Sequence, residues 1–333
     1  MKRNFALGCV FIALATLIFS TMEVMLKLPA VSGAFHPMQI TMERFLVGGL
    51  CLIPVAALTL KKKGVRLTAA DLRYFALTGL LNIPLGMVLF QLAVTCGQAN
   101  SVAVIFSGNP IFVTMLAFLI LHEVIHWNNI LALVFDILGI LIIVNPFGGG
   151  EISPLSVALT ILSALFFSLY AVMGKKKTQQ VGSIVVACCS FLFGSLELCA
   201  LLLLGRTGVG AALYQAVGLE FFCQVPFFQG LTAATLPYFL FIGVINTAAG
   251  YVFHMLAIEK TSATHGSLVF FFKPILAPII ALVVLGEAIT TPIALGIGMF
   301  LTGSLLGIIP EAIRTHRAET APTPSEPETT PTK

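Results

Sequence analysis

The chain alternates long apolar blocks with short polar stretches, and the blocks are about 20 residues long, which as helices match the hydrocarbon thickness of a bilayer. Apolar residues fill whole blocks and are not restricted to one helical face. The pattern therefore predicts an all-α integral membrane protein with ten transmembrane helices. We expect these helices near 5–26, 38–60, 72–94, 101–121, 128–145, 155–174, 182–204, 236–258, 265–285 and 292–310.

The second half of the chain repeats the first. The stretch Phe106–Pro110 recurs as Phe270–Pro274, an offset of 164 residues, and each copy leads to a Leu-x-Glu ending at Glu123 or Glu287. The same offset pairs Tyr74 with Tyr238, Gly79 with Gly243, Asn82 with Asn246, Gly86 with Gly250, Gly139 with Gly303 and Pro146 with Pro310. The first predicted helix also recurs, with Phe19–Lys27 echoed by Phe167–Lys175 at an offset of 148. This internal duplication indicates that the fold consists of two copies of one structural unit.

Five helices per copy is an odd number, so the second copy should enter the membrane with inverted topology, as in many secondary transporters. We expect a first five-helix repeat over 1–147 and a second over 155–310. Residues 205–235 form an insertion on the outer face, either an interfacial or re-entrant piece or a bulky loop. Residues 311–333 are rich in Thr, Pro and Glu, which predicts a disordered cytoplasmic tail.

Composition and charge agree with this pattern. The chain of 333 residues is 58% hydrophobic and 10% charged, with a mean hydropathy of +1.02, which excludes an ordinary water-soluble domain. With the N-terminus inside, 14 of the 18 Lys and Arg residues fall on the inner side, as the positive-inside rule requires. We therefore expect a multi-pass protein of the inner membrane with both termini in the cytoplasm.

Other function classes find little support in the sequence. The seven cysteines follow no disulfide or metal-ligand spacing, and the basic residues cluster at helix ends, not in a nucleic-acid-binding patch. No phosphate-binding glycine loop occurs, which disfavours ATP-driven pumping. We expect no cofactor and no nucleic-acid partner. The expected partners are a small-molecule substrate and the lipid bilayer, with a homodimer as an open alternative.

Lys273 is the most informative polar residue, because it lies near the middle of a predicted helix, where a charge is costly and usually functional. It takes the place of Asn109 in the first copy, just before the repeated proline. We expect it to hold an anionic group of the substrate, together with Asn109. The alternative is a structural ion pair between Lys273 and Glu197 or Asp136.

Glu23 and Arg44 fall at similar depth near the outer ends of helices 1 and 2. An ion pair between them could serve as a gate or as static stabilisation, since buried pairs do not by themselves stabilise a protein. Glu23 is also a candidate for substrate binding or proton coupling, and Glu197 is a further candidate for the gate or ion-pair set.

Four more residues complete the predicted substrate site. Asn82 and Asn246 are repeat mates whose amides could bind ligand or hydrogen-bond between helices. His254 could relay protons, because histidine titrates near neutral pH. Tyr170 could supply an apolar wall.

Residues His122–His126 match His-Glu-x-x-His, the zinc signature of metalloproteases. The repeat mate, Gly286–Thr290, keeps the glutamate and lacks both histidines, and no third ligand is evident. We interpret the match as fortuitous and predict no metal site and no enzymatic activity. An intramembrane zinc metalloprotease is kept as the alternative function.

Taken in order, these motifs resemble the EamA-type transporters of the drug/metabolite transporter superfamily, over residues 5–310. The resemblance rests on the duplication, the proline-centred helices 4 and 9 that end in Leu-x-Glu, the glycines Gly139 and Gly303, and Arg44 in helix 2. Ser190, at the place that matches Arg44 in the second copy, departs from the pattern. The resemblance implies an alternating-access carrier whose helices 1, 3, 4, 6, 8 and 9 line a cavity, with helices 5 and 10 at the periphery. We predict a secondary transporter that exports a small polar metabolite such as an amino acid, with proton coupling as a further hypothesis.

Overall fold

The apolar blocks fold as helices in a computed structural model, which describes residues 2–122, 127–144, 153–260 and 268–320. Every regular element in this part of the chain is a helix. Within these described ranges, seven helices are long and apolar enough to cross a membrane, and three shorter apolar helices occupy Ile130–Val144, Phe272–Leu285 and Thr291–Gly303. Helices suit a bilayer because each one satisfies its own backbone hydrogen bonds. The protein is therefore a multi-pass helical membrane protein.

The first half of the chain breaks two of the predicted helices into pieces. Helix 1 breaks at Thr21 and helix 4 at Ser107-Gly108, so that α8 begins at Asn109. Glycine and proline at the second break explain why the helix stops and restarts there. The elements are α1 (Lys2–Ser20), α2 (Met22–Lys27), α3 (Pro29–Ser32), α4 (Pro37–Lys63), α5 (Ala69–Leu80), η1 (Leu81–Met87), α6 (Val88–Cys96), α7 (Ala99–Phe106), α8 (Asn109–Leu121) and α9 (Trp127–Val144).

The second half ends in a helix that is longer than predicted. α17 continues to Thr320, so the helix includes residues 311–320, which were expected to begin the disordered tail and where Ala, Ile and Arg favour helix. Residues 321–333 of the predicted tail lie outside the described residues. The elements are α10 (Pro154–Val181), α11 (Ser183–Leu204), α12 (Gly208–Ala216), η2 (Glu220–Phe222), α13 (Leu236–Leu240), η3 (Phe241–Ala249), α14 (Gly250–Lys260), α16 (Leu268–Leu285) and α17 (Thr291–Thr320).

The third and eighth predicted helices each contain a π-helical segment. These segments, η1 and η3, hold Asn82 and Asn246 respectively. Pro84 explains the first, since proline supplies no backbone N–H and displaces the ordinary hydrogen-bond ladder. π-Helical turns free backbone groups and often mark functional positions.

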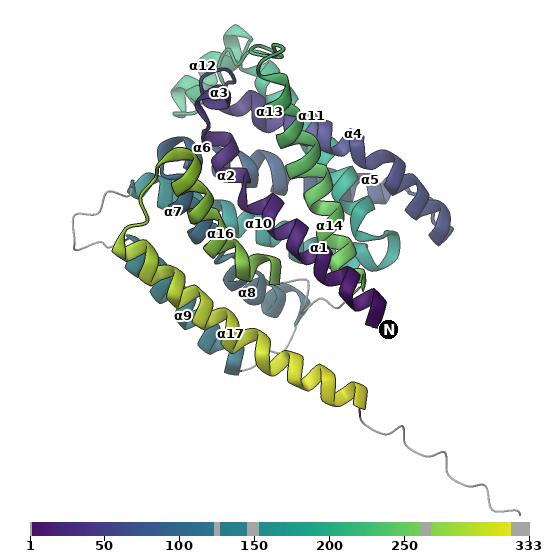
Figure 1. The fold of residues 1–333 in the computed structure, drawn as a ribbon. Helices are drawn as coiled ribbons and strands as arrows, with labels where there is room; N and C mark the ends of the chain where they lie inside the picture. The colour runs from purple at the N-terminus through teal and green to yellow at the C-terminus, as the bar shows by residue number, and fades with distance from the viewer. Residues whose placement is uncertain (1, 123–126, 145–152, 261–267, 321–333) are drawn as a thin grey trace, which may run out of the picture.

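The packing places α9 and α17 together at one side of the molecule. They lie against each other over their length, while α4 packs on α11 and η3, and α1 packs on α14 and α16 (Figure 1). α10 contacts α6, α8 and η1. The peripheral position of predicted helices 5 and 10 follows the expectation from the resemblance.

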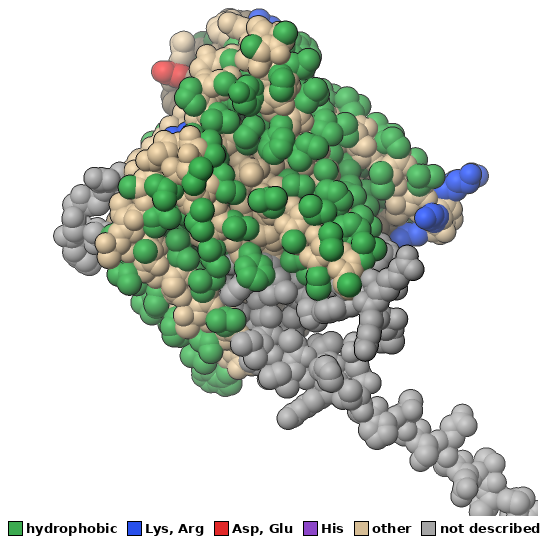
Figure 2. Space-filling model, viewed as in Figure 1, with side chains coloured by type: hydrophobic (Ala, Val, Ile, Leu, Met, Phe, Trp, Pro, Cys, Tyr) green, Lys and Arg blue, Asp and Glu red, His purple; other side chains and the backbone are tan. Residues whose placement is uncertain are grey.

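The outer surface of the bundle suits contact with lipid. Large apolar side chains are exposed along several helices, among them Leu58, Leu119 and Val283. Hydrophobic side chains cover most of the face in Figure 2, and Lys and Arg gather at one edge. Exposed apolar surface on this scale would be unfavourable in water, so it is explained by the bilayer.

Residues 205–235 form an ordered piece that includes the helix α12 and the short 3₁₀ helix η2. Tyr214, Phe222 and Val225 are buried in the main core cluster. The backbone N–H of Phe228 donates to Glu43 Oε1 at 2.9 Å, and Gln39 Nε2 donates to the carbonyl of Gln229 at 2.8 Å. The segment therefore covers the N-terminal end of α4 and is more structured than a bulky loop.

Candidate functional site: a cavity between the two halves of the chain

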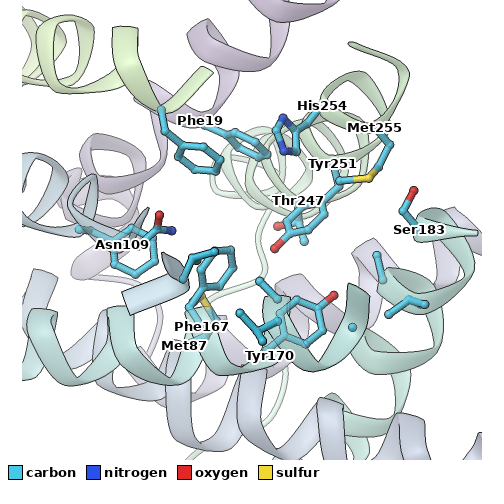
Figure 3. A pocket seen from close by; sticks show the side chains of 18 of the residues that line it. Phe19, Met87, Asn109, Phe167, Tyr170, Ser183, Thr247, Tyr251, His254 and Met255 are labelled. Carbon is cyan, nitrogen blue, oxygen red and sulfur yellow. The ribbon is translucent and has the colours of Figure 1, made fainter. Parts of the chain in front are cut away.

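A cavity of about 530 Å³ lies inside the bundle and is lined by helices from both halves of the chain (Figure 3). Its walls come from α1, α2, α4, η1, α6, α7, α8, α10, α11, η3, α14 and α16, so predicted helices 2 and 7 contribute in addition to the six that were expected. At one end the lining includes Thr178 and Ser183 and reaches the exposed Lys175, which indicates an opening at the α10–α11 junction.

Lys273 lines this cavity and is itself buried. Its ammonium donates to Glu23 Oε1 at 2.7 Å and lies 5.3 Å from the centre of the Phe106 ring. Glu23 is fully buried and does not belong to the described lining. The partner of Lys273 is therefore Glu23, and not Glu197 or Asp136 as the structural alternative proposed.

The predicted ion pair between Glu23 and Arg44 is absent among the described contacts, because the Glu23 carboxylate binds Lys273 instead. Arg44 lies on the cavity wall with 1% of its surface exposed. Its Nη1 contacts Met22 Sδ at 3.1 Å, and the guanidinium lies 4.4 Å from the centre of the Phe45 ring. Its Nε and Nη2 have no hydrogen-bond partner.

Four other predicted residues line the same cavity: Asn109, Tyr170, Asn246 and His254. The Asn246 amide oxygen accepts from Thr21 Oγ1 at 3.0 Å, which connects η3 to the break between α1 and α2. His254 stacks edge-on to Phe19 and Phe270, and its Nδ1 has no hydrogen-bond partner. Figure 3 shows Asn109, Tyr170 and His254 on different sides of the same space.

Three polar residues lie away from the cavity. Asn82 is fully buried in η1, where both atoms of its amide lack hydrogen-bond partners. Glu197 lies on α11, outside the described lining. Asp136 on α9 is packed against α17 close to Gly303, a position that suits a structural role. The structure thus brings together six of the predicted site residues, whereas Asn82, Glu23 and Glu197 are not among the described lining residues.

Tyr251, Thr247 and Phe167 also line the cavity and were not predicted. In Figure 3 Tyr251 and Thr247 lie across the space from Tyr170. Tyr251 follows Thr247 by four residues, so helical spacing places these two on neighbouring positions of one face. Without a repeat mate of similar type, that spacing alone did not distinguish Tyr251 from a core aromatic residue.

The other end of the bundle is closed by Glu287. Its carboxylate accepts from the backbone N–H groups of Ala99 at 2.9 Å and Asn100 at 3.0 Å, which are the first residues of α7. Lys27 at the end of α2 lies 3.1 Å from the same carboxylate and also donates to the carbonyl of Gly97. A carboxylate at a helix N-terminus is stabilised by the helix dipole. Glu287 thereby joins a loop of the second half to two helices of the first.

Only His122 of the zinc-like motif falls within the described residues. It ends α8 with a left-handed backbone (φ 55°), and residues 123–126 lie outside that part of the chain. Among the described residues, no group of three or more His, Cys, Asp or Glu side chains could hold a metal ion.

A multi-pass helical bundle around one ligand-sized cavity defines the class of membrane transport proteins. The sequence pattern of the EamA-like transporter family matches residues 6–145 and 154–309. The chain belongs to the EamA-like transporter family, within the drug/metabolite transporter superfamily.

Individual relatives agree with this assignment. A protein of Clostridium kluyveri named as an uncharacterized transporter is 34% identical over 304 residues, which cover 90% of this chain and 92% of the relative. An uncharacterized transporter of Bacillus subtilis, YvbV, is 24% identical over 263 residues, 79% of each chain. A solved crystal structure with 15% sequence identity shares the fold, with a TM-score of 0.58 over 91% of this chain and 97% of that chain. None of these names indicates a protease.

Proposed function

We propose that this protein is a secondary active transporter that moves a small metabolite by alternating access. Ten transmembrane helices would form two inverted five-helix repeats in the inner membrane, with both termini in the cytoplasm. The observation that carries the proposal is a cavity of about 530 Å³ that is lined from both halves of the chain. Inverted repeats that share a site near the midplane can expose it to either side by rocking.

The contacts at the two ends support an inward-facing state. Lys175 marks the open end, which lies on the side that the distribution of Lys and Arg assigns to the cytoplasm. At the other end, Glu287 holds Lys27 and the start of α7, and Glu43 holds the segment 205–235. A carrier in this state would load substrate from the cytoplasm, which suits export.

The substrate is proposed to be a small polar metabolite, for which an amino acid is the first candidate. The test is counterflow in proteoliposomes: protein reconstituted with unlabelled candidate inside should transiently accumulate the labelled compound from outside. A carrier gives saturable counterflow that empty liposomes lack. Absence of counterflow for every amino acid and organic acid in the panel would contradict the proposal.

Proton coupling is proposed through Glu23, whose carboxylate lies 2.7 Å from Lys273, or through His254, which lines the cavity. An imposed pH gradient should then drive uptake of a substrate found by counterflow. The variant Glu23→Gln with His254→Gln should lose this response and keep counterflow, which needs no net proton movement. An unchanged response to the gradient in the double variant would remove both residues from the coupling step.

A further inference from the structure

Arg44 is buried, and its guanidinium has no carboxylate partner among the described contacts. The residue has 1% of its surface exposed, and Nε and Nη2 have no acceptor within hydrogen-bond distance. The contacts that it does make, to Met22 Sδ and the Phe45 ring, are weak ones for a charged donor. A buried ionised group without hydrogen-bonded partners is strongly unfavourable, so such an arrangement persists where a ligand completes it.

The carboxylate that could have neutralised Arg44 is already engaged. Glu23 was the predicted partner of Arg44, but its Oε1 binds Lys273 at 2.7 Å. Lys273 and Glu23 therefore compensate each other, and the positive charge of Arg44 remains.

The cavity wall has the charge of an anion-binding site. Its described lining contains three cationic side chains, Arg44, Lys175 and Lys273, and neither aspartate nor glutamate. An ammonium group on a ligand would find only neutral acceptors such as Asn109 and Asn246. A zwitterionic amino acid is therefore a poor match, because its ammonium would be buried without a carboxylate partner.

The rest of the wall is aromatic and apolar. The rings come from Phe19, Phe45, Phe90, Phe106, Phe167, Phe270, Tyr170 and Tyr251. Rings at this density favour a ligand with a flat apolar body, which they can contact face-on or edge-on. A cavity of about 530 Å³ is within the range that holds small organic ligands.

We propose that the ligand of this cavity is an amphipathic organic monocarboxylate with an aromatic or similarly apolar body, and that Arg44 binds its carboxylate. The Nε and Nη2 donors of a guanidinium lie on one edge and match two carboxylate oxygens in a bidentate pair. This inference rests on the proposed function, and it replaces the amino acid as the first candidate substrate. The substrate carboxylate is then bound by Arg44 and not by Lys273, because the Lys273 ammonium is already paired with Glu23.

The test compares three probes that share a phenyl ring: phenylacetate, its neutral amide phenylacetamide, and the zwitterion L-phenylalanine. Purified full-length protein in detergent is heated with each probe, because a ligand of the folded state raises its apparent stability. We expect phenylacetate to bind about tenfold or more tightly than either other probe, from the strength of a charge-assisted bidentate contact. Equal or stronger stabilisation by the amide or by phenylalanine would overturn the proposal, as would no stabilisation by phenylacetate at millimolar concentration.

Variants of Arg44 test whether this residue causes the preference for phenylacetate over phenylacetamide. Arg44→Gln should bind acid and amide alike, and Arg44→Lys should keep a weakened preference for the acid, since lysine keeps the charge without the planar fork. The control is Arg66→Gln, an exposed arginine outside the cavity, which should behave as wild type. If Arg44→Gln does not fold, Arg44→Lys alone decides: a preference as strong as that of wild type would contradict bidentate binding by Arg44.

Counterflow of labelled phenylacetate separates this inference from the proposed function. Binding that depends on Arg44 without counterflow would retain the anion site and contradict the carrier. Counterflow of phenylalanine, with no binding of phenylacetate, would retain the carrier and contradict the anion site. Counterflow of phenylacetate that Arg44→Gln abolishes and Arg66→Gln preserves supports both.

Discussion

Lys273 and Glu23 show how a charge is accommodated in the middle of this bundle. Each is buried, and each has the other as its charged partner at 2.7 Å. Such a pair contributes little net stability by itself, because desolvation offsets the attraction between the charges. Removing one member, however, leaves the other charge buried and uncompensated.

This pair gives a double-variant prediction. Lys273→Met should lower the free energy of unfolding by about 3–5 kcal/mol, the usual result when one member of a buried pair is removed. Adding Glu23→Gln should recover most of that loss, because the remaining group is then neutral. Thermal and denaturant unfolding in detergent measures both values, with the exposed Lys62→Met as control. Additive losses in the double variant would show that the two side chains do not act as a pair.

Sequence reasoning found several polar residues of the cavity, but it missed Thr247 and Tyr251 and the way in which the charged residues pair. Lys273, Asn109 and Asn246 stood out because polar groups in apolar helices are few. The partner of Lys273 depends on how helix 9 lies against helix 1, and hydropathy carries no information on that register. Arg44 was therefore assigned to Glu23 by depth alone, which is wrong in this structure.

At the scale of elements, α5 and α11 cross at two glycines. A methyl group on Gly194 would lie 2.5 Å from the carbonyl oxygen of Gly79, and one on Gly79 would lie 2.6 Å from the nitrogen of Gly194. The hydroxyls of Thr78 and Ser190 meet at 2.8 Å beside this contact. Close backbone approach through small residues is a common way for membrane helices to pack.

Gly194→Ala should therefore separate the two helices and lower the free energy of unfolding by about 1–3 kcal/mol, as overpacking does elsewhere. The matched control is Gly298→Ala in α17, where an added methyl group meets nothing within 4 Å. That control should be neutral or stabilising by up to about 1 kcal/mol, because alanine favours helix over glycine. Thermal unfolding of both variants is the measurement, and equal effects at the two sites would contradict the packing seen at the crossing.

A second element-scale prediction concerns the segment 205–235. Glu43 Oε1 accepts from the Phe228 N–H and from Gln39 Nε2, so Glu43→Ala should release the segment from α4. Chymotrypsin should then cut next to its phenylalanines faster, by about tenfold if one charged hydrogen bond is lost. Glu220→Ala changes an exposed glutamate of the same segment and should cut at the rate of wild type. Equal cutting rates for the two variants would show that Glu43 does not hold the segment.

The helices themselves followed from the sequence better than their interruptions did. Apolar blocks of bilayer length predicted where helices lie, because burial in lipid determines that pattern. The π-helical segment η3 and the break at Thr21 share a side-chain contact between helices, the bond from Thr21 to Asn246. Those partners become visible only when the helices are assembled.

For the molecule as a whole, the two ends of the cavity differ. One end reaches the exposed Lys175, and the other lies below the contacts of Glu287 with α2 and α7. Glu287 is the repeat mate of Glu123, which lies outside the described residues. By the symmetry of the repeats, we predict that Glu123 makes the corresponding contact on the opposite side when the carrier opens outward. An alternating carrier would break the Glu287 contacts when it opens outward and restore them when it closes.

The most direct measurement is the rate at which an impermeant thiol reagent labels Val113→Cys from each face of the membrane, in a background without the seven native cysteines. Val113 lines the cavity on α8, and cysteine is close to valine in size. If the protein alternates, Glu287→Ala should raise the outer-face rate and lower the inner-face rate, since one population grows at the expense of the other. A rise in both labelling rates together would indicate a pore. No labelling from the outer face, with or without Glu287→Ala, would contradict alternating access.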